Sequence, residues 1–276
     1  MSSPTAANRQ VKLVRRPVGM VVRADFAIED APLPEPADGE VRVKIELVSL
    51  DPAMLGWMSD AKSYMPPVPL GGVMRGYAAG VVEVSRSTAL KPGDAVVGVL
   101  GIQRYAVAEP RHLIRADLSV APLARWLGGL GMTGMTAYFG ATEILKPKAG
   151  ETVVVSAASG AVGSLVGQMA KIAGARVVGI AGGADKCRHL TEKLGFDAAV
   201  DYKAARLAAD LSAACPNGID ANFENVGGEV LDAVLALMNP FGRIAICGLI
   251  SGYGRTEPAP GPRNMRAILT QRLRVQ

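Results

Sequence analysis

The stretch Glu151 to Val178, ETVVVSAASGAVGSLVGQMAKIAGARVV, decides the fold. It opens with an apolar, β-branched run, Thr152 to Val155, which is typical of a buried parallel strand. Small residues from Ser156 to Gly160 make a tight connection, and Ala161 to Ala173 then carries apolar residues at helical spacing. A second β-branched run, Arg176 to Ile180, follows. This order of strand, turn, helix and strand indicates a dinucleotide-binding βαβ unit.

The first turn of this helix is the expected contact with a cofactor pyrophosphate. Unpaired N–H groups at a helix N-terminus, together with the helix dipole, favour an anion there. We therefore predict cofactor contacts at Gly160, Ala161, Val162 and Gly163, with Gly160 allowing close approach and Gly163 letting the helix pack on the strand. Ala158 stands where the usual motif has its first glycine, so the motif by itself also fits an ordinary strand-to-helix turn of another α/β domain.

The composition indicates a well-packed globular protein. Hydrophobic residues make up 49% of the 276 residues, charged residues make up 20%, and the formal net charge is +5. Basic residues are not clustered with aromatic ones, which argues against a nucleic-acid partner. The sequence has neither an apolar signal core nor an apolar run of membrane-spanning length, so we expect a cytoplasmic protein without a membrane partner. Three scattered cysteines predict reduced thiols.

The distribution of turns, strands and helices along the sequence predicts two domains. Residues 1–122 have short apolar or alternating runs separated by Pro/Gly turns, which predict a small, partly open β-barrel with strands at Met20 to Phe26, Val41 to Leu50, Ala79 to Val84, Ala95 to Val99 and Tyr105 to Ala108. Residues 123–276 alternate strands and helices, which predicts a doubly wound parallel sheet. Its expected strands are Val153 to Ser156, Arg176 to Ile180, Ala198 to Asp201, Ala221 to Glu224 and Arg243 to Gly248.

The end of the second predicted strand of this sheet favours NADP(H). A ribose-binding acid is expected there in an NAD enzyme, whereas a 2'-phosphate requires that acid to be absent and a cation to be near. The strand ends in Ala181, Gly182 and Gly183, and Lys186 follows three residues later. Asp185 is interpreted as a helix-start acid.

Further motifs extend the pattern over essentially the whole chain: APLPEP, SLDPAM, SDAKSYMPPV, MRGYAAGVVEVS, GDAVVG, GMTGMTAYFG, ENVGG and FGRIAICGLISGY. With the βαβ stretch, they resemble the zinc-independent medium-chain dehydrogenase/reductases, in the group of leukotriene B4 dehydrogenase, prostaglandin reductase, curcumin reductase and 2-alkenal reductase. The resemblance implies a GroES-like β-barrel domain followed by a Rossmann domain. It also implies NADPH-dependent reduction of an activated carbon–carbon double bond.

The resemblance implies further cofactor contacts. Lys186 and Tyr202 match the family's 2'-phosphate contacts, and Asn225 matches a residue beside the nicotinamide half. Another cofactor segment corresponds to Cys247, Gly248, Leu249, Ile250, Ser251 and Tyr253. Zinc-dependent relatives carry a histidine ligand where this chain has Gly76, and the remaining His and Cys residues form no spaced ligand set, so no metal is expected.

Hydride delivery to an enone or enal needs a donor that supports the carbonyl oxygen. Tyr253 is the first candidate for this role and Tyr64 the second, although a ribose hydroxyl or water would also serve. We therefore predict an apolar enone or enal as substrate. The resemblance also implies a homodimer if the C-terminal region is complete. Two alternatives stay open. One is a quinone reductase of the same superfamily, which uses the same cofactor. The other is a truncated NADPH-binding protein with little turnover, because the resemblance implies a longer C-terminal part that completes the sheet.

Overall fold

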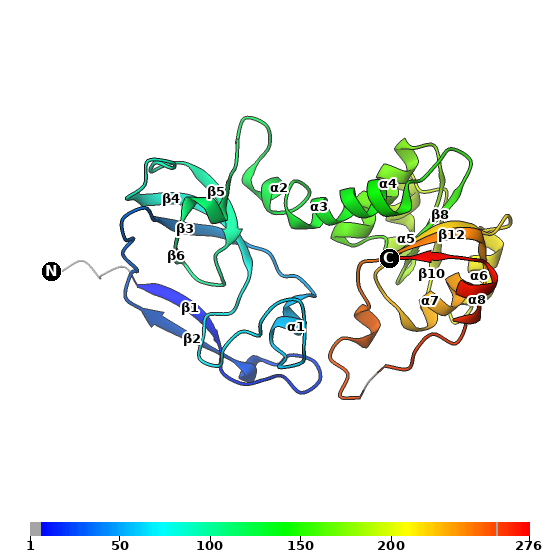
Figure 1. The fold of residues 1–276 in the computed structure, drawn as a ribbon, viewed down its shortest axis with the longest axis horizontal. Coiled ribbons are helices and arrows are strands. Elements are labelled where there is room, and N and C mark those ends of the chain that lie inside the picture. The colour runs from blue at the N-terminus through cyan, green and yellow to red at the C-terminus, as the bar shows by residue number, and fades with distance from the viewer. Residues whose placement is uncertain (1–6, 258) are drawn as a thin grey trace. The chain divides into compact units, whose positions relative to one another are not determined.

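The computed structural model describes residues 7–257 and 259–276, and it divides into two compact units (Figure 1). Residues up to Gly131, together with Tyr253 to Thr256, form the first unit, and the remaining residues form the second. The sequence placed the boundary after residue 122. It lies later in the structure because helix α2 (Leu123–Leu127) packs against strands of the first unit.

The first unit contains two antiparallel sheets. One sheet pairs β1 with β2, and the other has five strands in the order β6-β3-β4-β5-β7. The strands are β1 (Asn8–Leu13), β2 (Phe26–Ala31), β3 (Val41–Val48), β4 (Tyr77–Ser85), β5 (Ala95–Val99), β6 (Tyr105–Ala108) and β7 (Leu113–Arg115). Short helices lie between them: η1 (Arg23–Asp25), α1 (Met54–Trp57) and η2 (Pro110–His112). The sheet pattern expected for this half is confirmed, although the sequence did not predict β1, β2 or β7.

The predicted strand at Met20 to Phe26 is wrong. A 3-10 turn, η1, occupies this region because the Asp25 carboxylate accepts a hydrogen bond from the Val22 N–H at 2.8 Å and closes the chain on itself. Asp25 is 1% exposed and pairs with Arg15 at 2.7 Å. Strand β2 begins only at Phe26.

The second unit is a parallel six-stranded sheet in the order β10-β9-β8-β11-β12-β13. Its strands are β8 (Thr152–Ser156), β9 (Arg176–Ala181), β10 (Ala198–Asp201), β11 (Ile219–Glu224), β12 (Met238–Ile246) and β13 (Arg274–Val275). Numbered within this sheet, the order is 3-2-1-4-5-6, the classic doubly wound arrangement. The Rossmann expectation is confirmed. The sequence expected no complete last strand, and β13 pairs with β12 through two residues, Arg274 and Val275.

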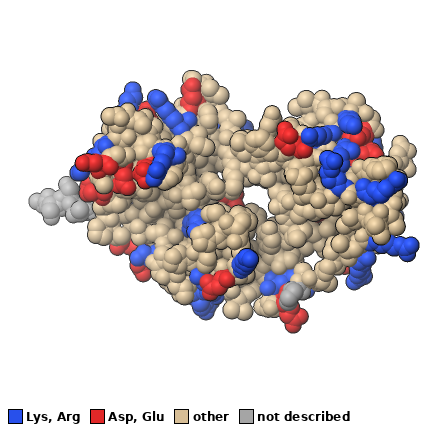
Figure 2. Space-filling view, in the orientation of Figure 1, with Lys and Arg blue, Asp and Glu red and all other residues tan. Residues whose placement is uncertain are grey.

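The helices of the second unit connect these strands. They are α3 (Met132–Phe139), η3 (Gly140–Leu145), α4 (Ala161–Ile172), α5 (Ala184–Arg188), η4 (His189–Lys193), α6 (Leu207–Ala214), α7 (Gly228–Leu235), η5 (Ile250–Gly252) and α8 (Arg266–Thr270). Among the residues that the structure describes, no helix is long and apolar enough to cross a membrane. On the face drawn in Figure 2, Lys and Arg side chains stand among Asp and Glu side chains with broad uncharged areas between them.

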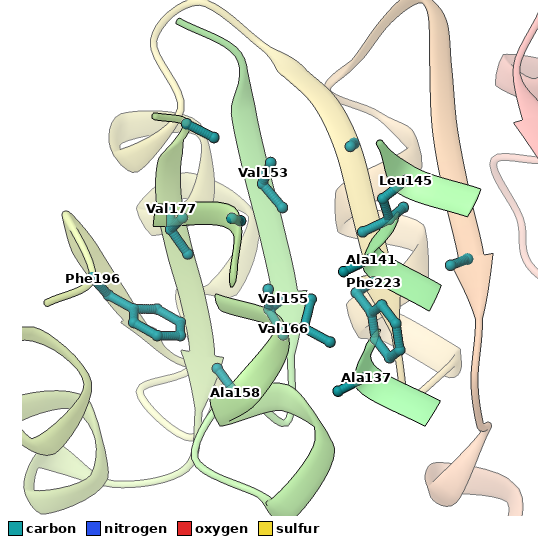
Figure 3. Packing of buried hydrophobic residues seen from close by; sticks show 14 of the residues in the cluster. Ala137, Ala141, Leu145, Val153, Val155, Ala158, Val166, Val177, Phe196 and Phe223 are labelled. Atoms are coloured by element: carbon teal, nitrogen blue, oxygen red, sulfur yellow. The ribbon is translucent and has the colours of Figure 1, made fainter. Parts of the chain in front are cut away.

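The core on one side of this sheet combines alanine, valine and leucine side chains with two aromatic rings. Val153 and Val155 of β8 face Val166 of α4, and Phe223 lies beside Ala137 and Ala141 (Figure 3). Glycines make room for the rings. A β-carbon at Gly140 would lie 2.4 Å from the Phe223 ring, and one at Gly167 would lie 1.9 Å from Phe196. Helix α4 therefore packs closely on β8 and fixes the turn between them.

Candidate cofactor site

The turn between β8 and α4 holds the helix N-terminus at the carboxyl edge of the sheet. Ala157 has a left-handed φ of 47° although it is not a glycine, and Gly160 is the extended N-cap of α4. A β-carbon at Gly163 would lie 2.6 Å from the Ala157 carbonyl oxygen, so this glycine packs the helix against the turn, as the sequence predicts. The first-turn N–H groups of Ala161 and Val162 lack intrahelical acceptors and fit a pyrophosphate.

A second cradle forms where β9 ends beside β10. A β-carbon at Gly182 would lie 2.8 Å from the Tyr202 ring and 3.0 Å from Cε of Lys203. The sequence proposed Tyr202 and Lys186 for a 2'-phosphate, and Lys186 is exposed on α5, which follows directly after Gly183. Across residues 7–257 and 259–276, neither Lys186 nor Lys203 forms an ion pair, so both ammonium groups are available for an anion.

Asp201 was not predicted and organises this cradle. Its Oδ1 accepts hydrogen bonds from the backbone N–H of Gly183 at 2.8 Å and of Lys203 at 2.9 Å. These backbone bonds, first that of Gly183, lower the pKa of the Asp201 carboxyl. Strand β9 ends without an acidic residue, but Asp201 at the end of β10 contacts the loop that follows β9, at Gly183. In the sequence Asp201 appears as the last residue of a predicted strand, and only the pairing of β9 with β10 brings it to Gly183.

Glu224, at the carboxyl end of β11, is the second residue that sequence reasoning missed. Its side chain is 0% exposed. Oε1 accepts hydrogen bonds from Ser156 Oγ at 2.9 Å, Val226 N at 2.7 Å and Gly227 N at 2.8 Å. Oε2 accepts one from Asn222 Nδ2 at 3.0 Å. Four donors converge on a group that has only acceptors, which compensates for burying it.

Asn225 follows Glu224 and is held by Ser156. The Asn225 backbone N–H donates to Ser156 Oγ at 2.7 Å, and its Nδ2 donates to the Ser156 carbonyl oxygen, also at 2.7 Å. One N–H of Nδ2 is used in this bond, which leaves Oδ1 and the second N–H of the amide for a ligand. Asn225 therefore offers an acceptor at the point between β8 and β11 where the strand order reverses, which is where doubly wound sheets bind ligands.

The segment after β12 is joined to the segment after β11. Cys247 N and Gly248 N donate to the Glu224 carbonyl oxygen at 2.8 and 3.1 Å. Ile250 N donates to the Asn225 carbonyl oxygen at 3.1 Å, and Ser251 Oγ donates to the Val226 carbonyl oxygen at 2.6 Å. The structure thus brings the predicted segment Cys247 to Ser251, which includes Leu249, to Asn225.

The two tyrosines proposed as oxygen donors belong to the first unit. Tyr64 is 86% exposed in the loop before Val68. Tyr253 directly follows η5 and is 36% exposed. A β-carbon at the next residue, Gly254, would lie 2.8 Å from Sδ of Met20, which explains why Tyr253 to Thr256 group with the first unit.

Gly76 has apolar surroundings. A β-carbon there would lie 3.2 Å from Met54 Cε and 3.3 Å from Ile102 Cγ1. In the described part of the chain, no group of three or more His, Cys, Asp or Glu side chains is placed to hold a metal ion.

Each of the two units contains a segment that matches a known protein family. A profile described as "N-terminal domain of oxidoreductase" matches residues 9–116, and one described as "Zinc-binding dehydrogenase" matches residues 161–276. The chain belongs to the medium-chain dehydrogenase/reductase family. The family resemblance expected from the sequence is thereby confirmed.

Two curated relatives and one solved structure illustrate the similarity within this family. The chain is 45% identical over 280 residues to the "NADPH-dependent curcumin reductase" of Escherichia coli (strain K12), covering 100% of this chain and 81% of that one. It is 42% identical over 277 residues to the "2-alkenal reductase (NADP(+)-dependent)" of Nicotiana tabacum, covering 98% and 80%. CurA from Vibrio vulnificus in complex with NADPH superposes with a TM-score of 0.92 at 44% identity, covering 97% and 81%.

Proposed function

We propose that this oxidoreductase uses NADPH to reduce the activated carbon–carbon double bond of apolar α,β-unsaturated aldehydes or ketones. The cofactor is NADP(H), in agreement with the sequence prediction and with the names of the relatives. The observation that carries the substrate class is the identity of 45% and 42% with proteins named curcumin reductase and 2-alkenal reductase.

The second unit offers a place for each part of NADPH. The first turn of α4 would hold the pyrophosphate, and the cradle of Gly182, Tyr202 and Lys203, with Lys186, would hold the 2'-phosphate. Asn225 Oδ1 would accept a hydrogen bond from the nicotinamide half. Bound NADPH supplies the hydride, and the substrate carbonyl oxygen takes up the developing charge.

Support for that oxygen is proposed to come from Tyr253, with Tyr64 as the second candidate. A tyrosine hydroxyl can donate a hydrogen bond to a carbonyl oxygen on which charge develops. If Tyr253 has this role, Tyr253→Phe lowers kcat for an enone while the affinity for NADPH stays within about twofold. Tyr64→Phe tests the second candidate in the same way. If both variants retain full kcat, the donor is a cofactor hydroxyl or water.

The substrate class is tested by following NADPH consumption with matched compounds. An apolar enone, the corresponding saturated ketone and a quinone are each offered to the full chain. We expect turnover of the enone and none of the saturated ketone. Turnover of the quinone alone would favour the quinone reductase alternative. Reduction of the saturated ketone to an alcohol would contradict double-bond specificity. NADPH binding without any turnover would favour the remaining alternative.

A cytoplasmic location is proposed as expected from the sequence, and a homodimer, if the C-terminal region is complete, is proposed from the family resemblance. Light scattering coupled to size-exclusion chromatography distinguishes a dimer from a monomer of 28.7 kDa.

A further inference from the structure

Ser156 links the two halves of the parallel sheet at its carboxyl edge. It is the last residue of β8, is 0% exposed, and accepts the Asn225 N–H on the hydroxyl oxygen that itself donates to Glu224. Because Ser156 Oγ is 2.9 Å from Glu224 Oε1 and 3.4 Å from the Phe223 carbonyl oxygen, the Glu224 carboxylate is the closer acceptor. The hydrogen bonds therefore run from Asn225 through Ser156 to Glu224.

This chain of hydrogen bonds leads to one side of the cofactor site. The 2'-phosphate cradle lies at β9 and β10, and the pyrophosphate turn follows β8. A dinucleotide bound across the strand-order reversal then places its other half over β11 and β12. Asn225 and the segment Cys247 to Ser251 are on that side. The Glu224 side chain is linked to Asn225 through Ser156, and the Glu224 carbonyl oxygen accepts hydrogen bonds from Cys247 and Gly248.

We propose that Ser156 and Glu224 are positioning residues that hold Asn225 in place for the nicotinamide half of NADPH and have no part in binding the adenosine half. This inference rests on the proposed NADPH binding. A buried carboxylate is costly unless it is fully hydrogen-bonded, and here three of its four donors come from Ser156 and the turn that contains Asn225. Loss of the Ser156 hydroxyl would leave the Asn225 N–H without its acceptor and free the turn to shift.

The test compares two ligands on the full chain, without any unsaturated substrate. The affinity for NADPH depends on both halves of the site, whereas the affinity for adenosine 2',5'-bisphosphate depends on the adenosine half alone. Ser156→Ala is expected to weaken NADPH about tenfold, the effect of one loosened hydrogen-bonded contact, and to leave adenosine 2',5'-bisphosphate within about twofold. The matched control is Ser164→Ala on α4, whose hydroxyl makes one long contact of 3.5 Å with the Ala161 carbonyl oxygen.

Glu224→Gln tests the carboxylate in a second way. A glutamine oxygen can still accept from Ser156 and the turn, while its Nε2 would face the Nδ2 of Asn222. Asn222 Oδ1 is buried and has no hydrogen-bond partner, so rotation of that amide gives the new donor an acceptor. Glu224→Gln is therefore expected to keep NADPH affinity within about threefold, because its carbonyl replaces the interactions made by Oε1.

Three results would overturn the proposal. These are equal weakening of both ligands by Ser156→Ala, unchanged NADPH affinity in that variant, and a selective loss of adenosine 2',5'-bisphosphate. If Ser156→Ala does not fold, Ser156→Cys keeps the size of the side chain and a weak donor, and the same ligand comparison applies. If the wild-type chain binds neither ligand, the proposed NADPH binding itself fails, and this outcome is distinct from a change confined to the variants.

Discussion

Gly163 lies so close to Ala157 that a β-carbon on the glycine would come within 2.6 Å of the Ala157 carbonyl oxygen and 2.9 Å of the α-carbon of Ala158. Both atoms belong to the backbone, which cannot move aside as the end of a flexible side chain would. The distance between turn and helix is thus set by the absence of a side chain at residue 163.

Gly163→Ala is expected to destabilise the second unit, because overpacking of this kind costs about 1–3 kcal/mol. The urea midpoint of the wild type and the variant checks this. Gly160→Ala is the matched control in the same turn, since its β-carbon would meet the Ala157 carbonyl oxygen at 3.1 Å and no second atom within 4 Å. Equal midpoints for Gly163→Ala and the wild type would contradict the packing argument.

Lys203 is expected to contribute to NADPH selectivity alongside Lys186. Lys203→Ala should raise the Kd for NADPH about tenfold, since a hydrogen bond to a charged group contributes roughly 1.5–3 kcal/mol. NADH lacks the 2'-phosphate and should bind the variant as it binds the wild type. Titration of both cofactors against wild type, Lys203→Ala and Lys186→Ala measures this. The control is Lys193→Ala, an exposed lysine at the end of η4.

An equal loss of NADH and NADPH affinity in Lys203→Ala would show that Lys203 supports the loop instead of recognising phosphate. That outcome is informative because Lys203 also donates its backbone N–H to Asp201. The backbone bond persists in the alanine variant, so a selective loss points to the ammonium group.

Asp201 predicts a pH dependence of stability. Its pKa in the folded state is lowered below the unfolded value of about 3.9 by hydrogen bonds from the N–H groups of Gly183 and Lys203. The stabilisation is therefore complete above the unfolded pKa and is lost as the pH falls through the folded pKa. The difference in thermal midpoint between wild type and Asp201→Asn should be largest near neutral pH and shrink below about pH 4.

Thermal unfolding from about pH 7 to pH 3 measures this difference. The exposed Asp38 provides the control, because Asp38→Asn should show little difference at either end of the range. A difference in thermal midpoint between wild type and Asp201→Asn that stays constant across the range would contradict the prediction. It would mean that these backbone bonds do not lower the pKa of the Asp201 carboxyl.

The sequence was sufficient for the architecture of the second unit because short apolar runs, β-branched in β8 and β9, alternate with segments of helical spacing. Ala198–Asp201 is predicted to the residue, and the other four expected strands overlap β8, β9, β11 and β12. In the first unit the apolar run around Val22 predicts a strand that does not form, since the Asp25 carboxylate turns the chain there. β1 (Asn8–Leu13) is rich in polar residues and gave no apolar signal.

The candidate site was predictable where it depends on local sequence and not where it depends on neighbouring strands. Gly160, Gly163 and the acid-free end of β9 follow from a single βαβ segment. Asp201 and Glu224 each look like an ordinary residue at a strand end, and their partners are far away in sequence. Ser156 and Glu224, for example, meet only because β8 and β11 are adjacent in the sheet.

The bond between Ser156 and Glu224 also limits how freely the two halves of this sheet can be exchanged between homologues. A chimera that joins residues up to β9 and β10 of one protein to β11 and β12 of another would unite a serine and a glutamate that had not been selected together. If the serine differs, the hybrid buries a carboxylate with one donor missing, and if the glutamate differs, the buried Ser156 hydroxyl loses its closer acceptor. Crossover points within this unit should therefore keep both positions from the same parent.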